Sequence, residues 1–158
     1  NREDNTMEWV KLNRPLSHET IKKLEEELGI NLPRDFIDWY SLYDLPKQQE
    51  LLVDVDGEPC DIDSFYPIQM MASESKSFFD EDKQLSENGK VLPFAFDSIG
   101  SQYCFFYPKN SKAPSTIFFH HKDDHVSELF DGDHIDESFT ISSTFQGFLD
   151  QLYIREED

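Results

Sequence analysis

The segment Lys90–Pro108 reads KVLPFAFDSIGSQYCFFYP, and it decides the fold that we expect. Two dense apolar runs, Val91–Phe96 and Tyr103–Tyr107, flank a short polar stretch centred on Gly100. Successive side chains of a strand point to opposite faces, so both faces of the second run are apolar, which suits a central strand. Ser98–Gln102 supplies turn residues, and Gly100 can adopt a positive φ. We therefore predict a β-hairpin in the middle of a sheet.

Two helices are expected before this hairpin. Pro15 and Ser17 open the first, with Ser17 as the N-cap, and Gly29 ends it as a left-handed residue. The second begins at Pro33, because proline is favoured in the first turn of a helix. Aromatic residues at helical spacing indicate a core face rather than a ligand site. This aromatic stripe consists of Phe36, Trp39, Tyr40 and Tyr43.

The other segments read as short strands, turns and a final helix. We expect strands at Leu51–Val55, Ile62–Ile68, Thr116–His120 and Val126–Phe130, a helix at Ile68–Phe79, and a turn at His121–His125. Ser143 and Gln146 fit a capping box at the start of a C-terminal helix. Gly147 lowers the propensity of that helix, and close packing would account for it. Its apolar face is Phe145, Phe148, Leu149, Leu152 and Tyr153.

Four stretches, taken in order, resemble one protein family. They read LEEELGINLPRDFIDWYS, VLPFAFDSIGSQYCFFYP, FFHHKDDH and SFTISSTFQGFLDQLY. From about Ser17 to Tyr153 the chain resembles the SUKH superfamily. That superfamily contains bacterial immunity proteins of polymorphic toxin systems and fungal cell-wall-synthesis regulators. The most specific parts are Leu28–Phe36 and the strand–Gly–strand unit around Gly100.

These patterns predict a single α+β domain with a mostly antiparallel central sheet. The N-terminal helix pair and the C-terminal helix should pack on one face, because their apolar stripes need a common surface. We divide the chain into a lead-in (1–12), one SUKH-like domain (13–154) and an acidic tail (155–158). Met7 is a candidate initiator, which leaves residues 1–6 as an unstructured lead-in or as foreign to the native chain.

Acidic residues outnumber basic ones by 33 to 14, which gives a net charge of −19. The first 50 residues hold 7 basic and 11 acidic residues, and the remaining 108 hold 7 and 22, a net of −15. Such a field repels nucleic acid and anionic membranes and attracts basic proteins, although solubility alone is an alternative reason for it. Cys60 and Cys104 do not form a disulfide framework, so we expect a cytoplasmic protein.

The densest acidic stretch is the candidate partner-binding patch, and a solvated loop or a metal site are its alternatives. An EF-hand needs glycine at position 6 and glutamate at position 12, whereas here Gly57 is at position 4 and Phe65 at position 12. His121 and His125 have ligand spacing but lie in a turn, where the rings need not converge. We therefore expect no metal and no cofactor. The patch residues are Asp54, Asp56, Glu58, Asp61 and Asp63, with Asp123 and Asp124 as a second candidate.

Signatures of catalytic nucleophiles, phosphate loops and dinucleotide sites are absent from the sequence. Cys104 has no evident partner base, and no catalytic residue is predicted. The first hypothesis, which the resemblance implies, is a non-enzymatic immunity protein whose partner is a basic toxin, nucleases among the candidates. The alternatives are a regulatory scaffold of the same fold, or an acidic hydrolase. A monomer without nucleic-acid or membrane binding is favoured, and the toxin and the surface it covers stay open.

Overall fold

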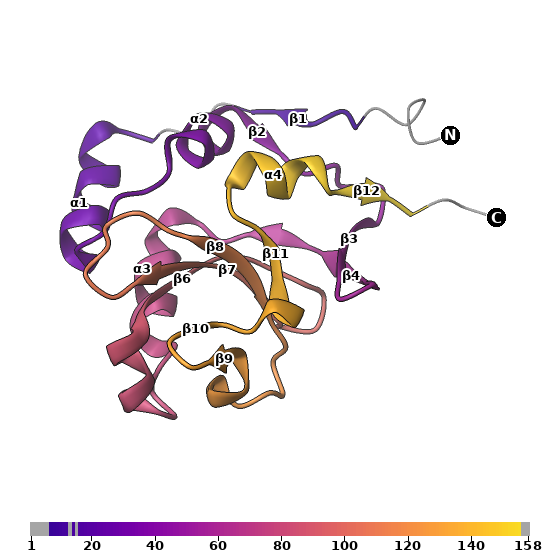
Figure 1. The fold of residues 1–158 in the computed structure, drawn as a ribbon. Coiled ribbons are helices and arrows are strands. Elements are labelled where there is room, and N and C mark those ends of the chain that lie inside the picture. The colour runs from indigo at the N-terminus through magenta and orange to yellow at the C-terminus, as the bar shows by residue number, and fades with distance from the viewer. Residues whose placement is uncertain (1–6, 13, 15, 156–158) are drawn as a thin grey trace.

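The central hairpin is formed by β6 (Gly89–Phe96) and β7 (Gln102–Pro108), which pair antiparallel as predicted (Figure 1). It lies inside a five-stranded antiparallel sheet with the order β11-β8-β7-β6-β5. The other three strands are β5 (Ser64–Phe65), β8 (Thr116–His120) and β11 (Thr140–Ser142). The computed structural model describes residues 7–12, 14 and 16–155. The predicted α+β class and the central sheet are confirmed.

Strand β7 buries both of its faces. Tyr103, Phe105 and Tyr107 belong to the main hydrophobic core, while Cys104 and Phe106 belong to a smaller core on the opposite face. All five side chains are at most 1% exposed. The alternation of apolar residues in the sequence therefore places β7 between two cores, as a central strand requires.

Three helices cover the main face of the sheet, as predicted: α1 (His18–Leu28), α2 (Arg34–Leu42) and α4 (Phe145–Asp150). The Phe36 ring of α2 lies 5.5 Å from that of Phe105 in β7 and 5.0 Å from that of Phe145 in α4, measured between centroids. Ser17 is the N-cap of α1, and Gly29 ends it at φ +69°. Pro15 lies outside the described residues.

Helix α3 (Ile68–Ser77) lies along the edge of the sheet and contributes Ile68, Met71 and Ala72 to the main core. Phe78 and Phe79, which follow the helix, belong to the smaller core. Strand β5 pairs with Ala95 and Phe96, near the end of β6. Nearer the start of β6, the Ser75 hydroxyl donates a 2.6 Å hydrogen bond to the carbonyl oxygen of Val91. The helix thus covers a strand edge that would otherwise expose backbone groups. A 3₁₀ helix, η2 (Lys83–Asn88), connects this region to β6.

The strand predicted at Val126–Phe130 is wrong, because Val126–Leu129 forms a 3₁₀ helix, η3. The ring of His125 accepts the N–H of Ser127 at 3.1 Å, and the Glu128 carboxylate accepts the N–H of His125 at 3.2 Å. This capping box favours a helical turn over extended backbone. A small hairpin of β9 (Phe130–Asp131) and β10 (His134–Ile135) follows, and η4 (Glu137–Phe139) leads into β11.

The C-terminal helix differs from its prediction at both ends. Thr144, rather than Ser143, is the N-cap, and its hydroxyl accepts the N–H of Gly147 at 3.0 Å. The helix ends at Asp150, because β12 (Tyr153–Ile154) pairs with β3 (Leu51–Val55). Close packing at Gly147 is present, since a Cβ there would lie 2.3 Å from the Ser142 hydroxyl oxygen. Elsewhere, the strand predicted at Ile62–Ile68 is too long, because β5 comprises only Ser64–Phe65.

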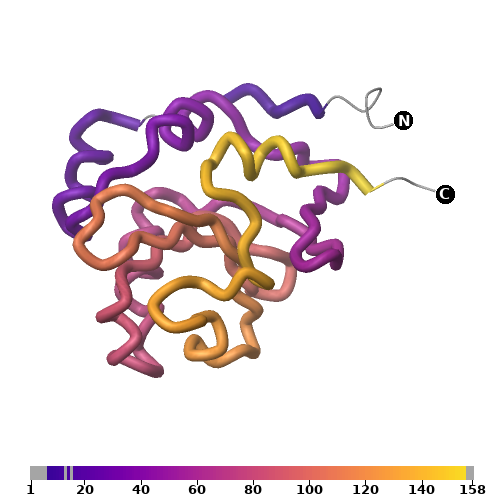
Figure 2. Tube along the Cα trace, in the orientation of Figure 1, coloured from indigo at the N-terminus to yellow at the C-terminus, as the bar shows by residue number. Residues whose placement is uncertain are grey.

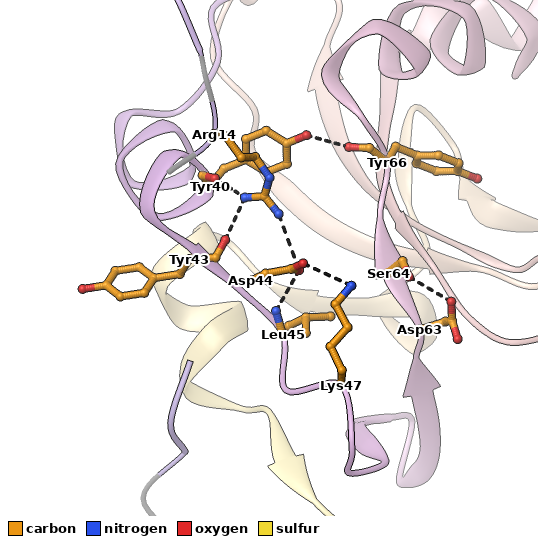
Figure 3. Close-up of polar contacts among 9 residues, drawn as sticks. All are labelled: Arg14, Tyr40, Tyr43, Asp44, Leu45, Lys47, Asp63, Ser64 and Tyr66. Carbon is orange, nitrogen blue, oxygen red and sulfur yellow. Dashed lines mark hydrogen bonds and ion pairs between the residues drawn. The ribbon is translucent and has the colours of Figure 1, made fainter. Parts of the chain in front are cut away.

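The segment before α1 is attached to the end of α2. Strand β1 (Val10–Lys11) pairs with β2 (Tyr43–Asp44), so Tyr43 lies beyond the helix in which we expected it. The Arg14 guanidinium lies 4.0 Å from the Tyr40 ring centroid and donates to the carbonyl oxygens of Tyr40 and Tyr43 (Figure 3). It also pairs with the Asp44 carboxylate at 3.5 Å. Among the described residues, no helix is both long and apolar enough to cross a membrane.

Candidate functional site

The first acidic patch, which begins in the strand predicted at Leu51–Val55, lies on a β-hairpin. Strand β4 (Glu58–Ile62) pairs antiparallel with β3, and the pairing of Val55 with Glu58 leaves Asp56 and Gly57 as a two-residue loop. Both loop residues have positive φ, +51° and +79°. A two-residue loop of this kind matches the twist of its strands, so the patch rests on a regular hairpin.

The five predicted carboxylates spread along this hairpin. Asp56 occupies its tip, and Asp54 and Glu58 are exposed on β3 and β4. The Tyr153 hydroxyl donates to Asp54, and the Ser64 hydroxyl donates to Asp63 at 2.9 Å. Asp61 and Asp63 lie nearest the central sheet, whereas Asp56 is at the opposite end of the hairpin.

Several of these carboxylates lie near the half-buried thiol of Cys60 and affect its pKa. Burial is the largest cause that raises its pKa, and nearby negative charges raise it further. The carboxylates responsible belong to Asp97, Asp61, Asp54 and Glu58. Three predicted patch residues therefore share their surroundings with Asp97, a residue that the sequence did not single out.

Asp97 organises the turn between β6 and β7. Its side chain is nearly buried, with 6% of the residue exposed, and its carboxylate accepts the N–H of Ile99 at 3.0 Å and that of Ser101 at 2.7 Å. The Asp97 N–H also donates to the Ser101 carbonyl oxygen at 3.0 Å. An aspartate that accepts from backbone two residues ahead is a recognised turn signal, and it could have marked this residue.

The segments that carry the two predicted patches both contact this turn. On one side, the Asp61 carboxylate accepts the N–H of Ser98 at 3.0 Å. On the other side, the N–H of Lys122 donates to the Ser101 hydroxyl at 3.0 Å, which places the neighbouring Asp123 and Asp124 beside the turn. Asp123 is exposed and Asp124 is half-buried. Residues far apart in the sequence thus meet at one end of the central hairpin.

Ile99 lies at the tip of the turn and is 54% exposed, so an apolar side chain projects from the turn that the two patches flank. The Lys122 side chain also lies beside this turn, since a Cβ on Gly100 would be 3.9 Å from its Cδ. We use the name acidic face for the surface formed by this isoleucine and the predicted patch residues. Its members are Ile99, Asp54, Asp56, Glu58, Asp61, Asp63, Asp123 and Asp124. The face combines an exposed isoleucine on an anchored turn with carboxylates on both sides of that turn, which is chemistry for binding a basic protein surface.

Metal ligation and nucleophilic chemistry find little support in the geometry. Within residues 7–12, 14 and 16–155, no group of three or more His, Cys, Asp or Glu side chains is arranged to hold a metal ion. The rings of His121 and His125 accept backbone N–H groups, those of Asp123 and Ser127. Complete burial raises the pKa of the Cys104 thiol, which therefore stays protonated at neutral pH.

A family model described as the SMI1 / KNR4 family (SUKH-1) matches residues 15–151. The chain belongs to the SMI1 / KNR4 family. The resemblance to the SUKH superfamily is thereby confirmed. The SMI1 / KNR4 family covers immunity proteins and related regulators. No curated protein and no solved structure matches the chain.

Proposed function

We propose that this SMI1 / KNR4 protein is an immunity protein, a non-enzymatic antitoxin that binds and neutralises a basic toxin domain directed at nucleic acid. Its family supports the class, since that family covers immunity proteins and related regulators. The negative net charge of the chain supports a basic partner, because proteins that hold nucleic acid carry Lys and Arg in their clefts to neutralise phosphates. A strongly acidic domain is electrostatically complementary to such a cleft.

The observation that carries this proposal is the exposed Ile99 on the turn that the two acidic patches flank. Binding energy at protein interfaces concentrates in a few well-packed anchors, while surrounding charges steer the encounter. The anchor is preorganised, because Asp97 and Asp61 hold the backbone of its turn. A turn that is already fixed loses little conformational entropy on binding.

The decisive experiment titrates the chain into the toxin domain encoded beside its own gene. We expect toxin activity to fall linearly and to disappear at one equivalent of the chain, because neutralisation acts by occupancy. An enzyme would instead inactivate the toxin at far lower ratios and progressively with time. Stable binding of a neighbouring protein that is not toxic would favour the regulatory role and contradict neutralisation.

Charge reversal tests the surface that we assign. Replacing Asp54, Asp56 and Glu58 by Lys should slow association about tenfold or more, within the range that electrostatic steering supplies, with a weaker salt dependence. The matched control reverses Glu19, Glu26 and Asp38, exposed carboxylates of α1 and α2. Each triple variant raises the net charge of −19 by six. Equal rate losses in the two variants would exclude the acidic face as the site, and melting curves check that both fold.

A further inference from the structure

Five lysines gather at the end of the central hairpin that is opposite the β6–β7 turn. Lys76, Lys83 and Lys90, with one carboxylate, that of Asp80, line a hollow of about 480 Å³ beside α3 and η2. Lys90, Lys109 and Lys112 line an adjoining hollow of about 290 Å³ beside the loop that follows β7. We call the two hollows together the lysine groove. The residues that line both are Ser86, Gly89 and Lys90.

This gathering runs against the charge of the chain. Residues 51–158 carry a net charge of −15 and only seven basic residues. Five of those seven line the lysine groove. Like charges repel one another, so placing these five lysines together costs free energy. Solubility does not require such a cluster. A negatively charged ligand would offset this repulsion.

Three of the five ammonium groups are available to a ligand. Lys76 forms an ion pair with Glu27, and Lys90 donates a 2.6 Å hydrogen bond to the carbonyl oxygen of Leu28. Lys83, Lys109 and Lys112 have no carboxylate within 4.0 Å in the part of the chain that the structure describes. The side chains of these three are exposed. Their charge is therefore uncompensated at short range.

The floor of the groove is fixed by the backbone. Gly89 adopts φ +151°, and a Cβ there would lie 2.0 Å from the Tyr107 carbonyl oxygen, so the floor can carry no side chain. The loop after β7 is anchored by the N–H of Asn31, which donates to the Lys112 carbonyl oxygen at 2.8 Å. Figure 2 shows this loop beside the end of α1. The two lysines of the loop are therefore presented from an anchored backbone.

We propose that the lysine groove binds a small polyphosphate anion, of the size of a nucleoside triphosphate. Its larger hollow, about 480 Å³, falls within the volume range of small-ligand sites, and lysines act as point charges for phosphate groups. The net charge of −19 opposes an extended polyanion such as RNA, which would have to cross acidic surface, whereas a short anion fits within the groove. The eight residues of β6 separate the groove from the acidic face by roughly 25 Å.

Isothermal titration calorimetry with sodium tripolyphosphate, and with ATP as a second probe, tests this site at about 20 mM salt, where screening is weak. We expect saturable binding at one equivalent. Lys109→Gln with Lys112→Gln should weaken it about tenfold or more, and Lys83→Gln should weaken it further, since charge–charge attraction supplies the affinity. Lys11→Gln with Lys22→Gln, two exposed lysines outside the groove, removes the same charge and should change affinity less than twofold.

Three results would overturn the proposal. The first is that neither probe binds saturably. The second is that the groove variant and its control lose the same affinity. The third is that the mass of the protein increases with its concentration and that probe binding depends on this increase. The last result, measured by sedimentation, would mean that the acidic face of a second copy occupies the groove. Toxin neutralisation by Lys109→Gln with Lys112→Gln should match the wild type, so this site and the proposed function fail or succeed separately.

Discussion

Asp97, which holds the turn beneath Ile99, should be more costly to replace than any residue of the acidic face. In Asp97→Ala the N–H groups of Ile99 and Ser101 lose their acceptor. A hydrogen bond to a charged group contributes about 1.5–3 kcal/mol. The N–H of Ser101 is buried and that of Ile99 is half-exposed to water, which replaces part of the lost bond. We therefore expect the unfolding free energy to fall by about 2–4 kcal/mol, from an expected total of about 5–15 kcal/mol.

Asp97→Asn is the matched control, because its amide oxygen can accept the same two N–H groups without the charge. Neutral hydrogen bonds contribute about 0.5–1.5 kcal/mol each, so the Asn variant should lose less than about 2 kcal/mol. Urea unfolding measures both variants, and hydrogen exchange at the amide of Ser101 reports on the turn alone. If the two variants differ by less than about 0.5 kcal/mol, or if exchange at Ser101 is unchanged in the Ala variant, Asp97 does not hold the turn.

Two further predictions concern the cores and their tyrosines. Phe105→Ala and Phe148→Ala, both within the main core, should each lower the unfolding free energy by about 3–5 kcal/mol in urea titrations, and losses below about 1 kcal/mol would refute the packing. Burial is the main cause that raises the pKa of Tyr66 to about 12, and it raises the pKa values of Tyr103 and Tyr107 as well. Their contribution to stability is complete below the pKa of about 10 of the unfolded chain and is lost as pH rises through the folded-state values. Unfolding free energy should therefore fall between about pH 10 and 12. An increase in tyrosinate absorbance before unfolding that disappears in Tyr66→Phe would contradict the burial.

The sequence predicted the centre of the fold because the signals there are local and redundant. The apolar alternation of Tyr103–Tyr107 and the turn at Gly100 specify the hairpin together, and Ser17 and Gly29 mark both ends of α1. Where one weak signal competed with another, the prediction failed. Val126–Phe130 was predicted to be a strand, but the capping interaction of His125 and Glu128 favours a helical turn there.

Long-range pairing explains the other departures. Tyr153 continues the helical periodicity of α4, yet its backbone pairs with Leu52 in β3, a contact between residues about a hundred positions apart. Such pairing overrides local propensity and is not readable from a single segment. The β3–β4 hairpin was readable, because Asp-Gly is the strongest short hairpin signal, but Asp56 was assigned to an acidic loop on its charge.

The sequence analysis chose the acidic residues of the candidate site, but it did not predict how they come together in space. Any of the 33 acidic residues could have supplied the patch, and the local turn signal at Asp97 does not show which carboxylates meet around that turn. The lysine groove was missed for the same physical reason. Its five lysines come from α3, η2, β6 and the loop after β7, and the topology alone brings these segments together.

A single hairpin carries both surfaces, and this has a consequence for how they can vary. The turn of β6 and β7 holds Ile99 and Asp97, while the open end of the same strands holds Gly89, Lys90 and Lys109. A one-residue slip in register would exchange the buried and exposed faces of a strand, so neither surface can change by sliding the pair. Each surface can change through the segments that flank it: β4 and the 121–125 turn at one end, η2 and the loop after β7 at the other. The buried hairpin thus fixes where the two surfaces lie, and the exposed segments around it are free to alter which partners they recognise.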